Sequence, residues 1–211
     1  MTRLRSLSIA VGLLLVLPAA ADAATLEAGK SCYFNDQRAQ LSGSGFTPDS
    51  QVSFRINGRL LSQTVSSDAA GDFQVVYDPP RADTQRKLVI RATDVSGESA
   101  RTRIFASARR RVTADPDRSS NVRTWQAVLS LFGFGDGKAF IHYLNPNGVL
   151  KKTVRLGKLR GPCGRLKTGE RRVMPFDNPQ FGVWRLQFDT RRRYDRDTKN
   201  KAVIPVNVYR G

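Results

Sequence analysis

The stretch Gly45–Val65, GFTPDSQVSFRINGRLLSQTV, carries the pattern of a complete two-stranded hairpin. Apolar and polar residues alternate on both sides of Asn57-Gly58, and Asn-Gly between alternating runs is a strong signal for a type I′ turn. A two-residue loop fixes the strand register, so Ile56 is predicted to lie opposite Arg59, with pairing that continues in step away from the turn. One face of the hairpin is then apolar. That face carries Val52, Phe54, Leu61 and Val65.

A second copy of this pattern occurs at Gly133–Val154, GFGDGKAFIHYLNPNGVLKKTV. Its turn, Asn145–Gly148, is two residues longer, so a longer loop is expected between strands at 140–143 and 150–156. The repeat extends further, because Leu88–Asp94 (LVIRATD) is echoed by Val183–Asp189 (VWRLQFD). These echoes predict two similarly folded units in tandem.

The first 23 residues have the three parts of a secretory signal peptide. Two arginines follow Met1, an apolar run spans Ile9–Leu17, and Ala21-Asp22-Ala23 forms a small-residue cleavage site. A membrane anchor needs about 20 apolar residues, roughly twice the length of this run. We therefore expect cleavage near Ala23 or Ala24 and export of the chain. No second apolar run of this kind follows, so no transmembrane segment is expected.

Period-two alternation dominates the rest of the chain and predicts an all-β protein of two tandem immunoglobulin-like sandwiches. The expected domains are 24–106 and 121–211, joined by a polar, basic linker at 107–120 (SARRRVTADPDRSS). Strands are predicted in the first domain at 38–43, 51–56, 59–65, 72–77, 87–94 and 100–106. Those of the second domain are predicted at 123–132, 138–143, 150–156, 171–176, 183–190 and 202–210.

Two positions in the second domain need separate interpretation. The apolar residues of 122–132 also fit one face of a helix, but the corresponding segment of the first copy is a strand, which favours a strand here. Pro205 lacks the amide hydrogen that a central strand needs. The last strand is therefore expected at a sheet edge.

Several motifs of the first domain belong together: Gly43–Pro48 (GSGFTP), Asp68–Phe73 (DAAGDF), Pro79 and Leu88–Asp94. With them, most of 26–106 resembles the bacterial immunoglobulin-like modules of secreted and cell-surface proteins. The second domain resembles them only through the internal repeat, and has Gly161–Gly164 near the place of the Asp-x-x-Gly-x-Phe turn. The resemblance implies a β-sandwich that acts as a spacer, adhesive unit or binding platform, and it carries over no catalytic residue.

Two cysteines follow the signal peptide, Cys32 in the first domain and Cys163 in the second. In an exported chain an even number of cysteines permits a disulfide, which here would join the two domains. The alternative is a reactive thiol at Cys163, presented by its glycine-rich turn. That chemistry requires a base, and the only histidine, His142, lies in a predicted strand.

Other catalytic or metal-binding chemistry has little support. Asp115 and Asp117, like Asp195 and Asp197, stand two residues apart, but neither pair continues into the further oxygen ligands of a calcium loop. No phosphate loop, zinc spacing or serine elbow is present, so no cofactor is expected. A glycosidase pair would have to come from the few acids of the second domain. These are Asp136, Glu170, Asp177, Asp189, Asp195 and Asp197.

Charge is unevenly distributed along the chain, whose formal net charge is +17. Residues 24–106 contain 10 Lys/Arg and 9 Asp/Glu, a net of +1, whereas 121–211 contain 19 and 6, a net of +13. Such a field attracts polyanions without sequence preference, although a basic surface also keeps a protein soluble. The candidate polyanion-binding residues are Lys151, Lys152, Arg155, Lys158, Arg160, Arg191, Arg192 and Arg193.

The sequence thus predicts a secreted or cell-envelope module without catalytic activity, whose basic second domain binds anionic wall polymers or other polyanions. Sequence-specific recognition of nucleic acid is not expected. The alternative is a small secreted hydrolase that uses His142, Cys163 or an aspartate of the second domain. The sequence carries no signal for an oligomeric state.

Overall fold

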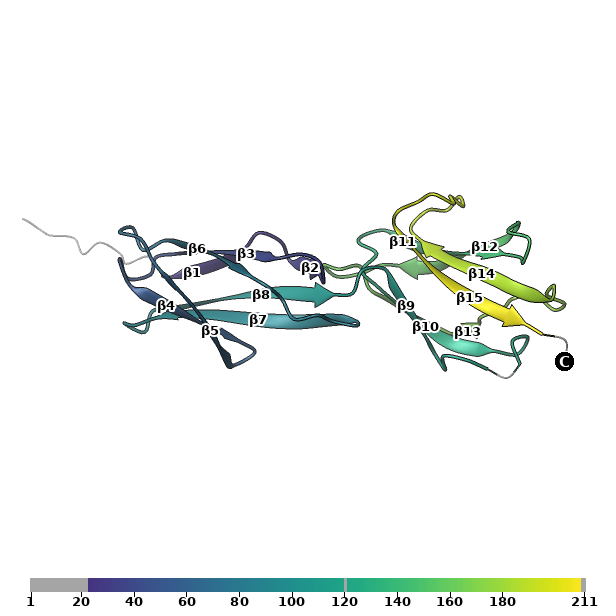
Figure 1. Ribbon diagram of the computed structural model, residues 1–211, viewed down its shortest axis with the longest axis horizontal. Coiled ribbons are helices and arrows are strands. Elements are labelled where there is room, and N and C mark those ends of the chain that lie inside the picture. The colour runs from purple at the N-terminus through teal and green to yellow at the C-terminus, as the bar shows by residue number, and fades with distance from the viewer. Residues whose placement is uncertain (1–22, 120, 210–211) are drawn as a thin grey trace, which may run out of the picture.

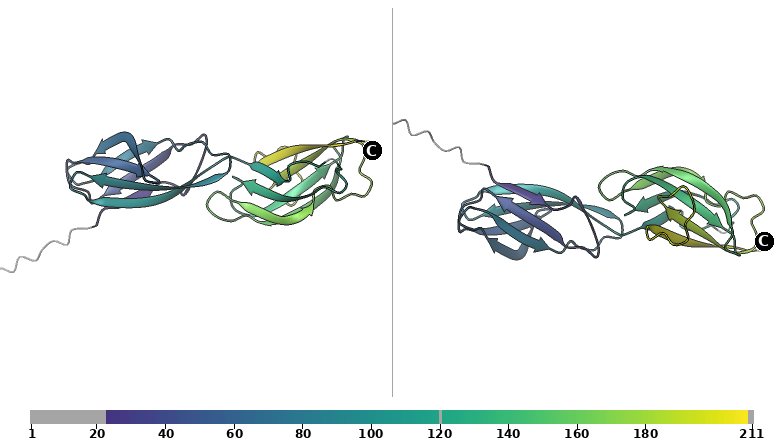
Figure 2. Two further views of the ribbon diagram at one scale, coloured as in Figure 1. Left: turned by 90° about the horizontal axis from the view of Figure 1, so that it is seen from below. Right: turned by 90° about the horizontal axis from the view of Figure 1, so that it is seen from above.

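The computed structural model describes residues 23–119 and 121–209, so the predicted signal peptide lies almost entirely outside the described residues. Every regular element in these residues is a β-strand, and the strands form four sheets. Figure 1 shows an elongated molecule in which two groups of strands follow one another end to end, and Figure 2 shows the same arrangement from below and from above. The described residues contain no helix capable of crossing a membrane.

The N-terminal unit is a sandwich of a three-stranded sheet, in the order β1-β3-β6, and a five-stranded sheet, in the order β2-β8-β7-β4-β5. Its strands are β1 (Thr25–Ala28), β2 (Cys32–Phe34), β3 (Ala39–Ser44), β4 (Gln51–Ile56), β5 (Arg59–Ser66), β6 (Phe73–Tyr77), β7 (Gln85–Asp94) and β8 (Ser99–Ser107). Alternate residues such as Leu41, Val52 and Ile90 point inward and form one hydrophobic core. The pairing of β3 with β6, of β4 with β7, and of β7 with β8 is that of immunoglobulin-type sandwiches.

The C-terminal unit repeats this plan with sheets β13-β10-β9 and β12-β11-β14-β15. Its strands are β9 (Arg111–Asp115), β10 (Gln126–Phe132), β11 (Lys138–Leu144), β12 (Leu150–Lys158), β13 (Leu166–Arg172), β14 (Gly182–Asp189) and β15 (Lys201–Val208). A second hydrophobic core, with Leu131, Ile141 and Phe188 fully buried, fills the space between the sheets. The fold is thus all-β, as predicted.

The hairpin of the first copy has the predicted turn. Asn57 and Gly58 both have positive φ, at 47° and 85°, and Ile56 lies opposite Arg59. The pairing does not continue in step, because it shifts between Ser53 and Arg55, where the three residues Leu61–Gln63 of β5 lie opposite Phe54 alone. A bulge of this kind increases the local twist of the pair. Leu61 and Val65 still pack against the core.

Other strand predictions are confirmed or corrected by the structure. The segment 122–132 contributes a strand, β10, and β15 with Pro205 is an edge strand, both as predicted. The expectation that 107–120 is a linker needs correction, because Arg111–Asp115 forms β9 and pairs with β10. The strand predicted at 171–176 is instead β13, Leu166–Arg172. The short strands β1 and β2 were not predicted.

The two units meet through a covalent and a polar connection. Cys32 and Cys163 form the predicted disulfide, with their Cα atoms 5.4 Å apart. Arg109 forms an ion pair with Asp36 at 3.0 Å, and its guanidinium lies 4.7 Å from the ring centre of Phe34. The disulfide and the contacts of Arg109 therefore hold the orientation of one unit relative to the other.

Candidate functional site

The outer face of the sheet β12-β11-β14-β15 collects basic side chains from four strands. In a sheet, residues that pair directly across strands point to the same side. The register and alternation of the strands place on this outer face Lys138, Lys151, Arg155, Lys158, Arg185 and Lys201, which we call the C-terminal basic face. Among the strand positions of this face the only carboxylate is Asp189, which is fully buried.

The structure brings together some of the predicted polyanion-binding residues and separates others. Lys151, Arg155 and Lys158 lie on the C-terminal basic face, and Arg191–Arg193 lie in the loop 190–200 that folds over it (Figure 1). Lys152 pairs with the core residue Tyr143 and so points away from that face. Arg160 lies at the turn that carries Cys163.

These predicted cations are largely unneutralised. All eight are exposed to solvent. Within the described residues only Arg191 forms an ion pair, with Asp195. The other seven have no carboxylate partner there, so their charges are available to an external anion.

A buried polar cluster fixes the loop 190–200 above the sheet. His142 Nε2 lies 3.2 Å from Asp189 Oδ1 and 3.1 Å from the carbonyl oxygen of Arg191. Because both neighbours are acceptors, Nε2 carries the hydrogen, and Nδ1 accepts the hydroxyl hydrogen of Thr153 at 2.9 Å. Gln187 Nε2 donates to Asp189 Oδ2 at 2.8 Å and to the Asp195 carbonyl at 2.9 Å. The loop is thus anchored at two backbone carbonyls.

Asp189 is the acceptor on which this cluster depends. Burial raises the pKa of its carboxyl, but hydrogen bonds from His142, Gln187 and the Arg191 amide outweigh burial and lower the pKa below its ordinary value. The carboxylate therefore remains charged at neutral pH and keeps its hydrogen bonds.

The same atoms resemble the hydroxyl–imidazole–carboxylate order of a nucleophilic triad, but the site lacks access. His142 and Asp189 are both fully buried, and His142 Nε2 is shared with a backbone carbonyl. A triad needs its nucleophile open to a substrate and beside an oxyanion hole. Cys163, the other candidate nucleophile, is buried and bonded to Cys32. The arrangement is that of a structural anchor.

The carboxylates of the C-terminal unit do not assemble into another site. Asp195 Oδ1 accepts the amide of Asp197, which is a local turn contact. Asp177 forms an exposed ion pair with Arg172. No group of three or more potential metal ligands occurs in the part of the chain that the structure describes.

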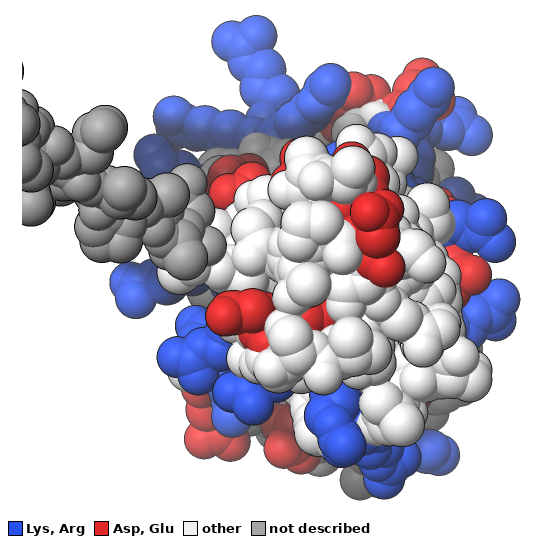
Figure 3. Space-filling model, turned by 90° about the vertical axis from the view of Figure 1, so that its left-hand side faces the viewer, with Lys and Arg blue, Asp and Glu red and all other residues white. Residues whose placement is uncertain are grey.

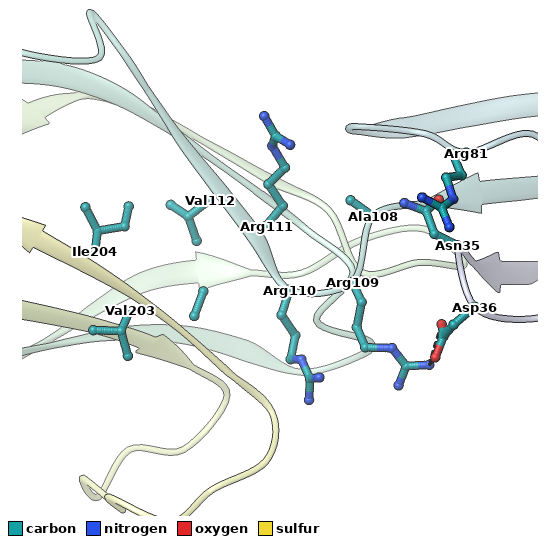
Figure 4. Close-up of a pocket in the computed structure, with 11 residues that line it drawn as sticks. Asn35, Asp36, Arg81, Ala108, Arg109, Arg110, Arg111, Val112, Val203 and Ile204 are labelled. Atoms are coloured by element: carbon teal, nitrogen blue, oxygen red, sulfur yellow. Dashed lines mark hydrogen bonds and ion pairs between the residues drawn. The ribbon is translucent and has the colours of Figure 1, made fainter.

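A basic groove of ≈ 730 Å³ lies at the junction of the two units (Figure 4). Its arginines are Arg81 and Arg109–Arg111, and Val203 and Ile204 form part of its apolar wall. Figure 4 shows that these arginine side chains point in different directions and do not converge on one position. Arg109 binds Asp36, and Arg110 donates to the carbonyl of Lys199. The arginines of this groove therefore link the two units and make the electrostatic potential at the junction more positive. They do not form a pocket for one compact anion.

A third basic feature lies on the N-terminal unit and was not predicted. Arg55 of β4 lies directly opposite Arg91 of β7, which lies opposite Arg101 of β8. We call these three residues the N-terminal arginine row. All are exposed, and none forms an ion pair within the described residues, nor does neighbouring Arg103.

The acidic residues of this unit lie elsewhere, which is why its net charge conceals the row. Asp49, Asp68, Asp72 and Glu98 lie in or next to the turns between strands. Figure 3 shows the end of the unit with uncharged and acidic side chains at its centre and Lys and Arg around its margin. The net charge of the N-terminal unit does not show that its acidic and basic residues lie in different places. The strand register does show it.

Comparisons with known proteins add no functional assignment. No protein-family model matches the sequence, and no curated protein matches it. Among solved structures, the chain is similar to a tetra-tandem repeat from the extending region of a large adhesion protein, with a TM-score of 0.33 and 14% identity over 88% of this chain. It is also similar to a putative membrane-anchored protein from Corynebacterium diphtheriae, with a TM-score of 0.39 and 12% identity over 89% of this chain.

A transglutaminase from red sea bream is matched at a TM-score of 0.29 and 12% identity, over 89% of this chain and 31% of the enzyme. The chain spans 48% of the adhesion-protein structure and 57% of the Corynebacterium one. Proteins of such different roles, at these identities, identify no function for this chain. The all-β fold is assigned from the strands and sheets described above.

Proposed function

We propose that this protein is an exported, non-catalytic module that binds linear anionic polymers of the cell envelope through its C-terminal basic face. The observation that carries the proposal is the set of exposed cations without carboxylate partners on and above one sheet. The disulfide between Cys32 and Cys163 supports an oxidising, extracytoplasmic location.

The chemistry of the C-terminal basic face favours anionic polymers that carry no nucleobases. Proteins that bind single-stranded nucleic acid stack bases on exposed aromatic side chains. The aromatic rings at strand positions of this face, Phe140 and His142, are buried. Guanidinium and ammonium groups bind phosphate, sulfate and carboxylate groups alike. The proposed ligands are therefore anionic glycans or polyol phosphates.

The test is a titration of the full chain with heparin and with a polyglycerol phosphate across a salt series. Binding should weaken with salt, because each neutralised anionic group releases counterions. Removing four cations should lower affinity and flatten the plot of log K against log salt by up to about 3 units. The variant is Lys151→Gln, Arg155→Gln, Lys158→Gln and Arg185→Gln.

A matched control removes four exposed arginines that belong neither to the C-terminal basic face nor to the loop 190–200 above it. It consists of Arg38→Gln, Arg86→Gln, Arg118→Gln and Arg123→Gln. The control should retain most of the affinity. The proposal is wrong if the wild-type chain binds neither polymer at low salt, or if both variants lose equal affinity. Tighter binding to oligo-dT than to heparin would overturn the choice of ligand.

A further inference from the structure

The N-terminal arginine row is an unfavourable arrangement for a free protein. Like charges directly opposite each other in a sheet are destabilising, and neighbouring strands are only about 4.8 Å apart. Arg55, Arg91 and Arg101 come from three adjacent strands, and the described residues supply no carboxylate to any of them. Arg55 Nη1 donates a hydrogen bond to the Gly58 carbonyl at 3.1 Å, which gives the guanidinium of Arg55 one neutral partner. An external anion would remove the repulsion.

The two basic surfaces face opposite sides of the molecule. In Figure 1 the strands that carry the row, β4, β7 and β8 of the five-stranded sheet, run along the lower side of the N-terminal unit, below β1, β3 and β6. In the C-terminal unit the sheet containing β11, β12 and β14 lies above β9, β10 and β13, and the loop 190–200 lies above it. The outer faces of these two sheets therefore point away from each other.

The junction keeps the two surfaces in this arrangement. The disulfide connects the units covalently, and Arg109 binds Asp36 and contacts Phe34. On the other side of the connection, Arg110 donates to the carbonyl of Lys199 in the loop above the C-terminal basic face. Because the orientation is held, one continuous polymer chain cannot lie flat on both surfaces without bending around the molecule.

We propose that the N-terminal arginine row is a second polyanion-binding surface, and that the protein cross-links two anionic polymer chains. This inference rests on the proposed function and specifies its geometry. A bivalent monomer joins polymers into a network at intermediate ratios. Excess protein disperses the network, because the polymer sites are then saturated and each protein molecule binds through only one of its surfaces. The ligand class is the same as for the C-terminal basic face.

The experiment measures light scattering of heparin mixed with the full chain at increasing protein-to-polymer ratios. The wild-type chain should give a scattering maximum at an intermediate ratio and clear again in excess. The row variant should retain binding, with affinity within about tenfold of wild type, but lose most of the maximum. It consists of Arg55→Gln, Arg91→Gln and Arg101→Gln.

Two controls separate the row from general charge and from folding. A charge-matched control should keep the scattering maximum, because it removes three arginines that are already ion-paired: Arg38→Gln, Arg118→Gln and Arg172→Gln. A conservative variant, Arg55→Lys, Arg91→Lys and Arg101→Lys, should keep the maximum, because it retains the three charges. Sedimentation velocity of the free wild-type chain should show a monomer.

The outcomes distinguish the two proposals. Absence of heparin binding by the wild-type chain would overturn the proposed function and this inference together. Full scattering by the row variant, with binding intact, would overturn only the second surface. A stable dimer in the free state whose scattering is unaffected by the row variant would assign cross-linking to self-association and reject the bivalent monomer.

Discussion

At the scale of single residues, the turn glycine Gly58 shows how the backbone determines which side chain is tolerated. Its φ of 85° lies in the left-handed region, and an added Cβ would meet no atom within 4 Å. Any loss of stability on substitution therefore comes from backbone strain rather than from a clash.

We expect Gly58→Val to lower the free energy of unfolding by about 1–3 kcal/mol, because β-branched residues resist positive φ. Denaturant unfolding of the full chain measures the effect. Gly169→Val is the matched control, since Gly169 also has open space around its Cβ and lies in β13 without a left-handed φ. Equal midpoints for the two variants would contradict the type I′ turn.

Asp94 makes the stability of the N-terminal unit depend on acid pH. Burial raises the pKa of its carboxyl, but hydrogen bonds from Thr47, Ser96 and Glu98 lower the pKa to about 2. A carboxyl with a lowered pKa stabilises the fold at pH values above its unfolded pKa of about 3.9, and this contribution is lost as pH falls through the folded value.

The expected result is a loss of stability between about pH 4 and pH 2 that is smaller in Asp94→Asn. Thermal melts at closely spaced pH values provide the comparison. Asp78→Asn, at an exposed ion pair with Arg38, is the control and should follow the wild type. If the melting temperatures of wild type and Asp94→Asn fall in parallel between pH 4 and pH 2, these hydrogen bonds do not stabilise the ionised carboxylate.

At the scale of elements, strands bounded by strong turn motifs could be predicted from the sequence. Strands without such motifs at their ends were misplaced or missed. Strand β4 was predicted with its observed bounds because it lies between a Pro-Asp turn and Asn57-Gly58. The strand prediction at 171–176 followed an apolar run, yet Val173 and Met174 are buried after β13 has ended. Strands β1 and β2 have too few residues for alternation to be recognised.

The internal repeat identified equivalent strands but not their facing residues. Leu88 in β7 is buried, whereas Val183, which aligns with it in β14, is 48% exposed. A shift of one residue exchanges the two faces of a strand, so an alignment of letters cannot determine which side chains reach the surface. For the same reason the sequence located the basic unit but not the C-terminal basic face.

The loop 190–200 should depend on Asp189 for its order. Asp189→Ala removes the acceptor of His142, Gln187 and the Arg191 amide, and leaves buried donors unsatisfied. Hydrogen exchange measured by mass spectrometry should then become at least tenfold faster in the loop, with β7 and β8 unchanged. Asp177→Ala, at an exposed ion pair, serves as the control. Uniform acceleration across both units would indicate global destabilisation instead.

At the scale of the whole molecule, the fold class and the concentration of charge in the C-terminal unit followed from the sequence. The disulfide was one of the interpretations that the sequence left open for its two cysteines, and the structure contains it. The N-terminal arginine row did not follow from the sequence, because its members are separated by tens of residues and meet only through strand pairing. Residues 24–106 are almost neutral in sum, and a sum carries no information on position.

The disulfide should contribute to the stability of the whole chain. Cys32→Ala combined with Cys163→Ala removes a cross-link between residues 131 positions apart. The chain-entropy model gives a loss of up to about 4–5 kcal/mol. Calorimetry of the oxidised wild type, the reduced wild type and the double variant tests this, and the last two should agree. A double variant that melts at the oxidised wild-type temperature would contradict it.

The position of the same bridge also determines how the protein carries mechanical load. When the two ends are pulled apart, tension passes from β1 to Cys32, across to Cys163 and on to β15, so most of the chain lies outside the stretched path. In a single-molecule pulling experiment, the fully extended oxidised chain should be shorter than the reduced one by roughly 430–470 Å, at about 3.3–3.6 Å per residue.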